Sequence, residues 1–474
     1  MFQDIEFGEI SAEVELEINP QLITKGFYKY CDIIDNILNK HHFLILGNKG
    51  TGKSIIGEHL RLSEGLQDDK SYLFCQSVNL AQFPYKSFNK IISGQSDPET
   101  KFPTTWKWIL LIYILRSFNK DSGISCDNSI GFNNAVETFK KIGLIPAELH
   151  EIALLASKNN FRIKLPIFEA SFDSSNTIGG ELHYLHMVSY LENTICQISS
   201  PNKHLLIIDG LDDILSSREI QYQSLTALIS EAQQVNRIMR DNNVPFKVIV
   251  LCRKDLYRRL PGPNKNKITR SFSIDLDWYQ DQVDIKDKEI YKLTLYRSSI
   301  SGEQGDIFGI YFPAKIKEKH PAQYLLEYTR YTPRDFLQLL TYIKKTTKED
   351  SVRSSDIISG IKEYSQKYFW PEIEDELDGY ISKNDVRSFK LVLIELNKRQ
   401  FMLNELIELA LKHGLSNIDF HKIMETLYEC GAISNMFKSN GHSKFQSRLK
   451  DDNDFNPGFP IVLHRGMHKA LNMG

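Results

Sequence analysis

The sequence predicts an α/β protein with a parallel sheet, followed by a mainly helical C-terminal part. Three observations predict this fold class. A glycine-rich turn at residues 47–54 joins an apolar run to a helical pattern, the apolar runs at 204–209 and 246–252 have the length of buried strands, and the strand pattern stops near residue 278. We therefore expect a sheet-containing core over residues 1–278 and helices beyond it.

The segment from Gly47 to Ser54 fits the pattern of a phosphate-binding loop. It follows the apolar run 42–46 and precedes the helical run 54–61. Its glycines let backbone N–H groups point at a polyphosphate, Lys53 reaches the β- and γ-phosphates, and Ser54 offers a hydroxyl to Mg²⁺. The alternative is a glycine turn that binds nothing. Such a turn would not need a strand before it and a helix after it, so the combination favours phosphate binding. The candidate cofactor-binding residues are Gly47, Asn48, Lys49, Gly50, Thr51, Gly52, Lys53 and Ser54.

Length and composition favour a multidomain globular protein. The chain has 474 residues, of which 41% are hydrophobic and 25% charged, and its net charge is −2. This charge gives no overall attraction to nucleic acid, so any such contact must come from a local patch. Six scattered cysteines without a C-x-x-C pair favour a reducing compartment. Since no apolar run approaches the roughly 20 residues of a membrane span, we expect a cytoplasmic protein without membrane contact.

Around the phosphate loop, the sequence predicts a βαβ unit and a large insertion. Residues 21–40 carry apolar side chains at a helical period, which predicts one helix before the first strand. Residues 71–78 form the second strand. Residues 81–200 read as a mainly helical insertion that begins near an apolar helix at 104–118 and ends with a helix at 181–198.

The next strand ends on a carboxylate. Four consecutive aliphatic residues before Asp209 predict a central parallel strand, buried on both faces. Ligands lie at the carboxyl ends of strands in open α/β sheets, so we expect Asp209 beside the phosphate loop, holding Mg²⁺ directly or through water. Either Asp212 or Asp213 would polarise the attacking water. The alternative is a strand that merely ends in an acidic turn.

The strand at 246–252 ends on a basic residue. An arginine at the tip of the strand beside the acidic one can reach a γ-phosphate, so Arg253 is a candidate sensor of nucleotide state. The alternative is an arginine that is solvated or paired with Asp255. A fifth strand at 271–276 would complete the sheet.

A separate helical segment, residues 279–378, follows the sheet. Within it, Thr332-Pro333-Arg334-Asp335 predicts a sharp helix start with Pro333 at the N-cap or first helical position. Arg334 then projects from a first turn and can bridge from a lid to the nucleotide. Its alternative is a pair with Asp335 or Glu327. Residues 371–378 read as an acidic connector.

The last segment, residues 379–474, has the element order of a winged helix. Three short helices precede a hairpin with an Asn440-Gly441 turn. The third helix, at 419–430, carries several acids and is a poor match to a phosphate-facing helix, whereas the wing is more basic. The basic wing residues are Lys438, His442, Lys444, Arg448 and Lys450. The sequence therefore leaves both DNA, through the wing, and a protein open as partners of this segment.

These motifs together resemble those of AAA+-related ATPases of the STAND and origin-recognition type, in which nucleotide domain, helical lid and winged helix follow in this order. Residues 205–213 are similar to the second acidic motif of NACHT-type members, residues 248–253 to their sensor strand, and residues 332–337 to the second sensor of origin-recognition relatives. The resemblance implies a strand order of 5-1-4-3-2 and Mg·ATP held between core and lid.

One departure from the resemblance concerns hydrolysis. Gly210 stands where ordinary AAA+ proteins carry an acid, which leaves the catalytic base open between Asp212 and Asp213 and predicts slow turnover.

A second departure is that the sequence shows no long repeat array after the winged helix, which is usual in larger STAND proteins. Compact bacterial members are often associated with defence against phage, and the resemblance implies the same association here. The candidate catalytic residues are Asp209, Asp212, Asp213, Arg253 and Arg334, and the candidate metal ligands are Ser54 and Asp209.

Two functional hypotheses follow. The first is an ATPase switch that couples nucleotide state to assembly of a homo-oligomer, or to engagement of DNA or of a co-encoded effector protein. The second is a winged-helix module that binds DNA or protein and holds a mainly structural nucleotide. A phosphoryl transferase would need an acceptor pocket that the sequence does not show.

Overall fold

The computed structural model describes most of the chain. The residues outside the description are 68–70, 82, 84–97, 153–179, 212–218, 263–264, 282, 379, 437–444, 446–453 and 474. The chain divides into two compact units. We call Cys31–Leu46 with Lys53–Asp275 the core unit, and Met1–Tyr30 with Gly47–Gly52 and Leu276–Gly474 the C-terminal unit.

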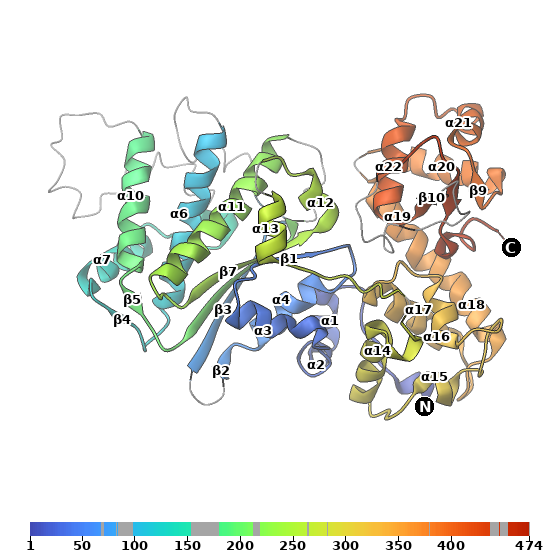
Figure 1. Ribbon diagram of the computed structural model, residues 1–474, viewed down its shortest axis with the longest axis horizontal. Coiled ribbons are helices and arrows are strands. Elements are labelled where there is room, and N and C mark those ends of the chain that lie inside the picture. The colour runs from blue at the N-terminus through green and yellow to red at the C-terminus, as the bar shows by residue number, and fades with distance from the viewer. Residues whose placement is uncertain are drawn as a thin grey trace. The chain divides into compact units, whose positions relative to one another are not determined.

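A six-stranded sheet in the order β2-β3-β6-β7-β1-β8 forms the centre of the core unit (Figure 1). Its strands are β1 (Leu44–Gly47), β2 (Gly65–Gln67), β3 (Ser71–Asn79), β6 (Lys203–Asp209), β7 (Phe246–Arg253) and β8 (Ser273–Asp275). The pairs β3–β6, β6–β7 and β1–β8 are parallel, and β2 pairs antiparallel at the edge. Numbered in chain order, the five predicted strands have the order 5-1-4-3-2, which confirms the predicted fold class.

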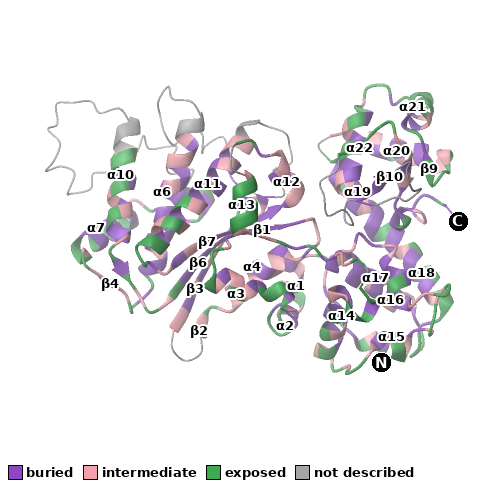
Figure 2. Ribbon diagram, in the orientation of Figure 1, coloured by how far each residue is buried: buried purple, intermediate pink, exposed green. Residues whose placement is uncertain are grey.

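Helices cover both faces of this sheet. They are α3 (Ile33–Asn39), α4 (Lys53–Leu62), α6 (Pro98–Phe118), α7 (Ser129–Lys141), α10 (Gly180–Ile195), α11 (Glu219–Asp241), α12 (Lys254–Arg259) and α13 (Lys265–Phe272). Helices α6 and α11 lie on one face, and α3 and α4 on the other (Figure 1). Strands β6 and β7 are buried along nearly their whole length, whereas α13 is largely exposed (Figure 2). The central strands therefore form the core, as the aliphatic runs predict.

The described part of the insertion is mainly helical. Helices α6, α7 and α10 carry it, together with a two-stranded ribbon of β4 (Ser125–Cys126) and β5 (Ile198–Ser199). The indole N–H of Trp106 donates to the carbonyl of Ser224 over 2.9 Å, which fixes α6 against α11. The insertion is thus fastened to the same face of the sheet as α11.

The prediction of one helix over residues 21–40 is wrong. The structure has two short helices, α2 (Pro20–Thr24) and α3, with a 3-10 turn at Tyr30–Asp32 before α3. Cys31 and Asp32 have φ values of 51° and 48°, a left-handed conformation that no α-helix accepts. The apolar period is real, but the helix is interrupted within it.

The C-terminal unit contains the residues from 276 onward and also residues 1–30, which the sequence analysis assigns to the core. Its N-terminal elements are η1 (Phe2–Asp4), α1 (Ala12–Ile18) and α2. Arg297 binds the buried carboxylate of Glu15 over 2.8 Å, and Gln338 donates to the carbonyl of Gly8. These long-range contacts, which no local pattern reveals, place the N-terminal segment with the C-terminal helices.

The helical segment predicted at 279–378 is present. Its elements are η4 (Ile285–Asp287), α14 (Glu289–Ile300), α15 (Ile307–Tyr311), α16 (Pro321–Leu326), α17 (Pro333–Thr346), α18 (Ser354–Tyr364), a π-helical turn at Ser365–Phe369 and α19 (Trp370–Leu377). The predicted acidic connector at 371–378 is therefore wrong, because these residues form α19. Glu372 and Glu376 are buried in it, whereas a solvated connector would expose them.

The final segment contains three helices and a three-stranded antiparallel sheet in the order β10-β11-β9. Its elements are α20 (Lys383–Leu396), β9 (Gln400–Phe401), α21 (Leu403–Lys412), α22 (Phe420–Glu429), β10 (Ile433–Asn435), β11 (Ile461–Leu463) and a 3-10 turn at Arg465–Met467. The predicted wing residues Lys438, His442, Lys444, Arg448 and Lys450 lie outside the described residues. In the described part of the chain, no helix has the length and hydrophobicity to cross a membrane.

Candidate functional site

The phosphate loop has the backbone conformation that its glycines predict. Gly50 and Gly52 have φ values of 84° and 98°, which side chains other than glycine rarely adopt. A Cβ atom on Gly50 would lie 3.1 Å from the Thr332 hydroxyl and 3.2 Å from Cβ of Arg334. The Thr51 hydroxyl donates to the Asn48 carbonyl over 2.8 Å and closes the turn. The loop is thus a tight turn that is closely approached at Gly50, whereas a Cβ atom on Gly52 would meet no atom within 4 Å.

The helix that follows the loop packs closely on the acidic strand and its neighbour. It begins with Lys53, which is buried, and Ser54. A Cβ atom on Gly57 would lie 3.1 Å from Leu251 on β7 and 3.4 Å from Ile207 on β6, so glycine permits this approach. The start of α4 is thereby set against the two strands that end in Asp209 and Arg253.

Asp209 ends β6, as predicted, and lies opposite Asn79 at the end of β3. Its Oδ1 accepts the backbone N–H of Gly210 over 2.8 Å. Gly210 has a φ of 75°, and a Cβ atom there would lie 1.9 Å from Asn79 Oδ1. An acid does not fit at position 210, which explains this departure from the AAA+ pattern. Asp212 and Asp213 lie outside the described residues.

Asn79 is a polar residue at this edge that the sequence analysis missed. Its Oδ1 accepts the backbone N–H of Ala81 over 2.8 Å, and its side chain is exposed beside Asp209. Its position directly after the predicted strand at 71–78 could have indicated this, because that strand lies beside the one that ends on Asp209. Asn79 adds an amide to the carboxylate at the carboxyl edge of the sheet.

Arg253 ends β7 and is paired with Asp255, the alternative that the sequence analysis considers. Its Nε and Nη2 donate to the two carboxylate oxygens over 2.9 and 2.7 Å. Burial alone would raise the pKa of Asp255, but the guanidinium outweighs it and lowers that pKa to about 2. A phosphate ligand must therefore compete with a carboxylate for this arginine.

In the C-terminal unit, α17 begins as predicted. Thr332 is the N-cap, its hydroxyl accepts the N–H of Asp335 over 3.2 Å, and Pro333 is the first helical residue. The backbone N–H of Arg334 donates to the carbonyl of Gly50 over 3.2 Å. The cap thus sets the direction of Arg334 and ties its peptide to the phosphate loop.

Arg334 has neither of the partners expected for it. Its Nη1 lies 3.6 Å from Oε2 of Glu372 on α19. Asp335 instead binds Arg330, and Glu327 binds Lys319 and Arg465. The contact that the arginine does make joins α17 to α19.

Asp335 is the centre of a buried network at the start of α17. It accepts Arg330 Nε and Nη2 over 2.8 and 2.9 Å, the Arg330 backbone N–H over 3.0 Å and the Tyr368 hydroxyl over 2.9 Å. Burial would raise the pKa of Asp335, but Arg330 lowers it to about 2. Four donated hydrogen bonds keep this carboxylate charged inside the protein.

Lys49 of the phosphate loop contacts two acids that the sequence analysis assigned to a connector. Its Nζ lies 3.2 Å from Glu372 Oε2 and 3.6 Å from Glu376 Oε1. The indole of Trp278 also donates to the carbonyl of Thr51 over 3.0 Å. The spacing of the two glutamates, four residues apart on one helix face, was the signal that could have found them.

Within each unit the structure brings together a different part of the predicted site. The core unit holds Lys53, Ser54, Asp209 and Arg253, all on α4 or at the ends of β6 and β7. The C-terminal unit holds residues 47–52 of the loop together with Arg334. The boundary between the units therefore falls inside the phosphate loop.

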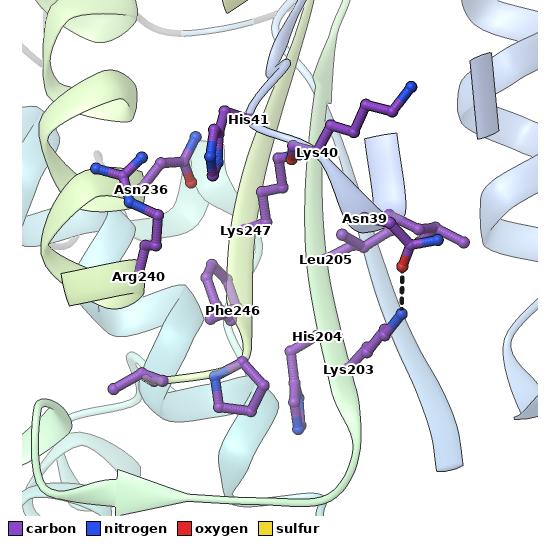
Figure 3. Close-up of a pocket in the computed structure, with 13 residues that line it drawn as sticks. Asn39, Lys40, His41, Lys203, His204, Leu205, Asn236, Arg240, Phe246 and Lys247 are labelled. Carbon is purple, nitrogen blue, oxygen red and sulfur yellow. Dashed lines mark hydrogen bonds between the residues drawn. The ribbon is translucent and has the colours of Figure 1, made fainter. Parts of the chain in front are cut away.

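A pocket of about 300 Å³ lies at the amino ends of β6 and β7 (Figure 3). Its lining includes four cations and no acid, which suggests an anion site. Each cation already has a partner, because Lys203 donates to Asn39, Lys247 to two carbonyls at the end of α3, Arg240 to Asp241, and Lys40 lies near Asp35. We therefore assign no ligand to this pocket.

Comparison with known proteins gives likenesses of fold. Residues 287–370 match the family described as the FunZ-associated C-terminal helical domain. No curated protein matches the chain.

Three solved structures are similar to the chain in fold. The Aeropyrum pernix ORC1 protein in complex with DNA has a TM-score of 0.39 and 11% identity, covering 93% of this chain and 89% of its own. Cdc6p from Pyrobaculum aerophilum has a TM-score of 0.32 and 12% identity, with 98% and 97% covered. The Drosophila ORC bound to DNA has a TM-score of 0.28 and 11% identity, with 99% and 88% covered. At these scores the functional argument rests on the residues of this chain.

Proposed function

We propose that the protein binds Mg·ATP at the phosphate loop and works as an ATPase switch of the STAND and origin-recognition-like AAA+ type. The observation that carries the proposal is the edge of the core sheet where the parallel strands β6 and β7 end on Asp209 and Arg253. Helix α4, which begins with Lys53, packs against both strands. A phosphate-binding loop, a carboxylate for a cation and an arginine are the groups that nucleoside triphosphate chemistry uses.

The residues present fit this ligand. The left-handed Gly50 and Gly52 form the cradle, and Lys53 would bind the β- and γ-phosphates. Ser54 and Asp209 supply oxygen donors, which Mg²⁺ prefers, and this ion usually takes only one or two carboxylates besides phosphate oxygens. Bound Mg²⁺ would neutralise charge on the phosphates. No group of three or more His, Cys, Asp or Glu that could hold a metal occurs among the described residues.

Arg253 and Arg334 are our candidates for sensing the γ-phosphate, and Asp212 or Asp213 for orienting the attacking water. In the structure both arginines contact carboxylates, Asp255 and Glu372. Phosphate oxygens form shorter, charge-assisted bonds with guanidinium groups than a carboxylate at 3.6 Å allows. Nucleotide binding would therefore change the partners of these arginines, which is the basis of a switch.

The output of the switch is proposed to be assembly or partner binding through the C-terminal unit. Its last three helices and the sheet order β10-β11-β9 support a winged helix, a module that binds DNA or protein. A homo-oligomer, a co-encoded effector protein and DNA are the partners we propose to test. A role in antiviral defence is supported only by the family resemblance.

One observation favours the second hypothesis, a binding module with a structural nucleotide. Gly210 occupies the position of an acid in ordinary AAA+ proteins, and its conformation excludes a side chain. Slow or absent hydrolysis is the expected consequence. Turnover therefore separates the two functions.

The experiment measures nucleotide binding with a fluorescent ATP analogue and phosphate release from Mg·ATP, with and without duplex DNA. We expect Lys53→Ala to weaken binding by about 100-fold or more while the protein stays folded, because the lysine contacts phosphate. Asp209→Asn should still bind ATP but lose Mg²⁺-dependent phosphate release. Lys141→Ala is the matched control, since Lys141 is exposed on α7 and removes the same charge.

Two outcomes would contradict the proposal. Equal nucleotide affinity of folded Lys53→Ala and Lys141→Ala would show that the loop is not the site. Nucleotide binding without phosphate release under any condition would leave the binding module with a structural nucleotide as the function. The mass of the particle in solution with and without ATP then tests the oligomer.

A further inference from the structure

Helix α19 holds the phosphate loop through a pair of buried carboxylates. Lys49 Nζ lies 3.2 Å from Glu372 and 3.6 Å from Glu376, and both glutamate side chains are less than 10% exposed. The two acids are four residues apart and therefore lie on one face of α19. We call Lys49, Glu372 and Glu376 the clasp.

The clasp shares one acid with the candidate sensor arginine. Oε2 of Glu372 lies 3.2 Å from Lys49, 3.6 Å from Arg334 and 3.8 Å from Arg330. Arg330 is committed to Asp335 by two hydrogen bonds. Glu372 thus contacts Lys49 within the loop and Arg334, whose backbone N–H donates to Gly50 of the loop.

The pairing at Glu372 is electrostatic and incomplete. Its Oε2 is buried and accepts no hydrogen bond from any residue that the structure describes, although three cations lie within 4 Å. A buried carboxylate oxygen without a hydrogen bond is costly, so this arrangement is not the strongest that the cations can form. Phosphate oxygens offer Lys49 and Arg334 better acceptors.

Helix α19 connects the clasp to the last three helices. It packs against α22, and the chain runs from its end at Leu377 directly to α20 at Lys383. Two hydrogen bonds also hold the loop within the C-terminal unit: the backbone N–H of Arg334 donates to the carbonyl of Gly50, and the indole of Trp278 donates to the carbonyl of Thr51. A third, from the Thr51 hydroxyl to the Asn48 carbonyl, lies inside the loop. A change at Lys49 would therefore act on α19, which directly precedes the last three helices in the chain.

We propose that Glu372 and Glu376 compete with nucleotide phosphates for Lys49 and Arg334, so that phosphate binding releases α19 and the helices that follow it. The inference rests on the proposed function, because it names the regulation of the same site. On this inference the two glutamates lower the affinity for nucleotide, and they take no part in a catalytic step. It also makes α19 the first moving part of the switch.

The first test measures the Kd for ATP of the full chain with Glu372→Gln, Glu376→Gln and the control Glu374→Gln. Glu374 lies on the same helix, and its Oε1 accepts the Trp370 indole N–H, a bond that glutamine keeps. We expect Glu372→Gln to bind ATP about tenfold more tightly than the control, because the competing charge is gone. Glu376→Gln should give a smaller gain, since its oxygen is farther from Lys49.

The second test follows amide hydrogen exchange of α19 with and without Mg·ATP. Wild-type protein should show faster exchange in α19 when ATP is added, and Lys49→Met should show it without nucleotide. Lys49→Met does not change the sequence of α19. Its exchange therefore tests whether Lys49 holds α19 even if Glu372→Gln does not fold. Melting temperature is the check that each variant is folded.

The outcomes separate the two proposals. Wild-type protein that binds no ATP contradicts the proposed function, and the competition falls with it. Wild-type protein that binds ATP, with equal affinities for Glu372→Gln and Glu374→Gln or with unchanged exchange in α19, overturns the clasp alone. Tighter binding together with faster exchange supports it.

Discussion

Each compact unit contains an arginine–aspartate pair near the predicted site, and the two pairs are held differently. Arg253 and Asp255 are two residues apart at the tip of β7, and the aspartate side chain is 13% exposed. Arg330 and Asp335 lie at the start of α17, where Asp335 is 0% exposed and also accepts the hydroxyl of Tyr368. The first pair joins close neighbours in the chain, whereas the second also ties the start of α17 to Tyr368.

This difference suggests different roles for two pairs of the same chemistry. The network around Asp335 fixes the helix start from which Arg334 projects, so exchanging its partner would disturb the fold. The pair at the strand end holds Arg253 at the carboxyl edge of the sheet, and on the proposed function we expect a phosphate to exchange with Asp255 there. We therefore regard the Arg330–Asp335 pair as structural and the Arg253–Asp255 pair as exchangeable.

Asp335→Asn is expected to have the largest effect on stability. The substitution removes the charge that Arg330 hydrogen-bonds and leaves only Glu372, 3.8 Å away, as a counterion of this buried arginine; breaking a buried pair typically costs about 3–5 kcal/mol in the free energy of unfolding. Urea unfolding at pH 7 measures this change. A loss below about 1 kcal/mol would contradict the structural role of the Arg330–Asp335 pair, because the network would then contribute no more than a surface ion pair.

The dependence of stability on pH is expected to come next in size. The pKa of both aspartates is about 2 in the folded protein, against about 3.9 in an unfolded chain. A lowered carboxylate pKa stabilises the fold above the unfolded pKa, and this contribution disappears as the pH falls through the folded pKa. Each group contributes on the order of 2 kcal/mol at pH 7 on this account.

Urea unfolding at pH 7, 4 and 3 checks the expected direction. Stability should fall steadily below about pH 5, and Asp335→Asn should lose less stability over this range than wild-type protein, because the variant has one fewer group to protonate. Parallel curves for the two proteins would show that Asp335 does not titrate as its contacts predict.

Asp255→Asn tests the other pair, Arg253 with Asp255. Arg253 ends the central strand β7, and its partner Asp255 is 13% exposed against 0% for Asp335, so we expect a loss of about 2 kcal/mol, smaller than for Asp335→Asn. Because the carboxylate no longer competes for the arginine, the Kd for ATP should fall several-fold while the Kd for ADP changes less. Equal changes for ATP and ADP would show that Arg253 does not sense the γ-phosphate.

The sequence predicted the local parts of the site and missed the long-range ones. The glycine turn at residues 47–52, the strand that ends on Asp209 and the cap that starts α17 each depend on neighbouring residues, and the structure has these elements where expected; phosphate binding stays a prediction. The aliphatic runs also predicted the sheet, since strands buried on both faces have few alternatives. Local patterns were therefore sufficient for the core sheet and for each helix start at the site.

The missed contacts join residues far apart in the chain. Glu372 meets Lys49 across more than 300 positions, and Glu15 meets Arg297 across 282 positions. An acidic run carries no sign of its partner, so residues 371–378 looked like a solvated connector. Asp212 and Asp213 lie outside the described residues, and their roles stay predictions.

Arg334→Ala is expected to have the smallest effect on stability and a selective effect on nucleotide. Its guanidinium is partly exposed and lies 3.6 Å from Glu372, a contact worth no more than about 0.5 kcal/mol, so the melting temperature should barely change. If Arg334 senses the γ-phosphate, ATP affinity should fall about tenfold while ADP affinity stays within twofold. If it serves only to neutralise Glu372, the loss should be equal for ATP and ADP, and the double variant with Glu372→Gln should bind ATP as tightly as Glu372→Gln alone. The double variant therefore decides whether the arginine acts on the ligand or only on the clasp.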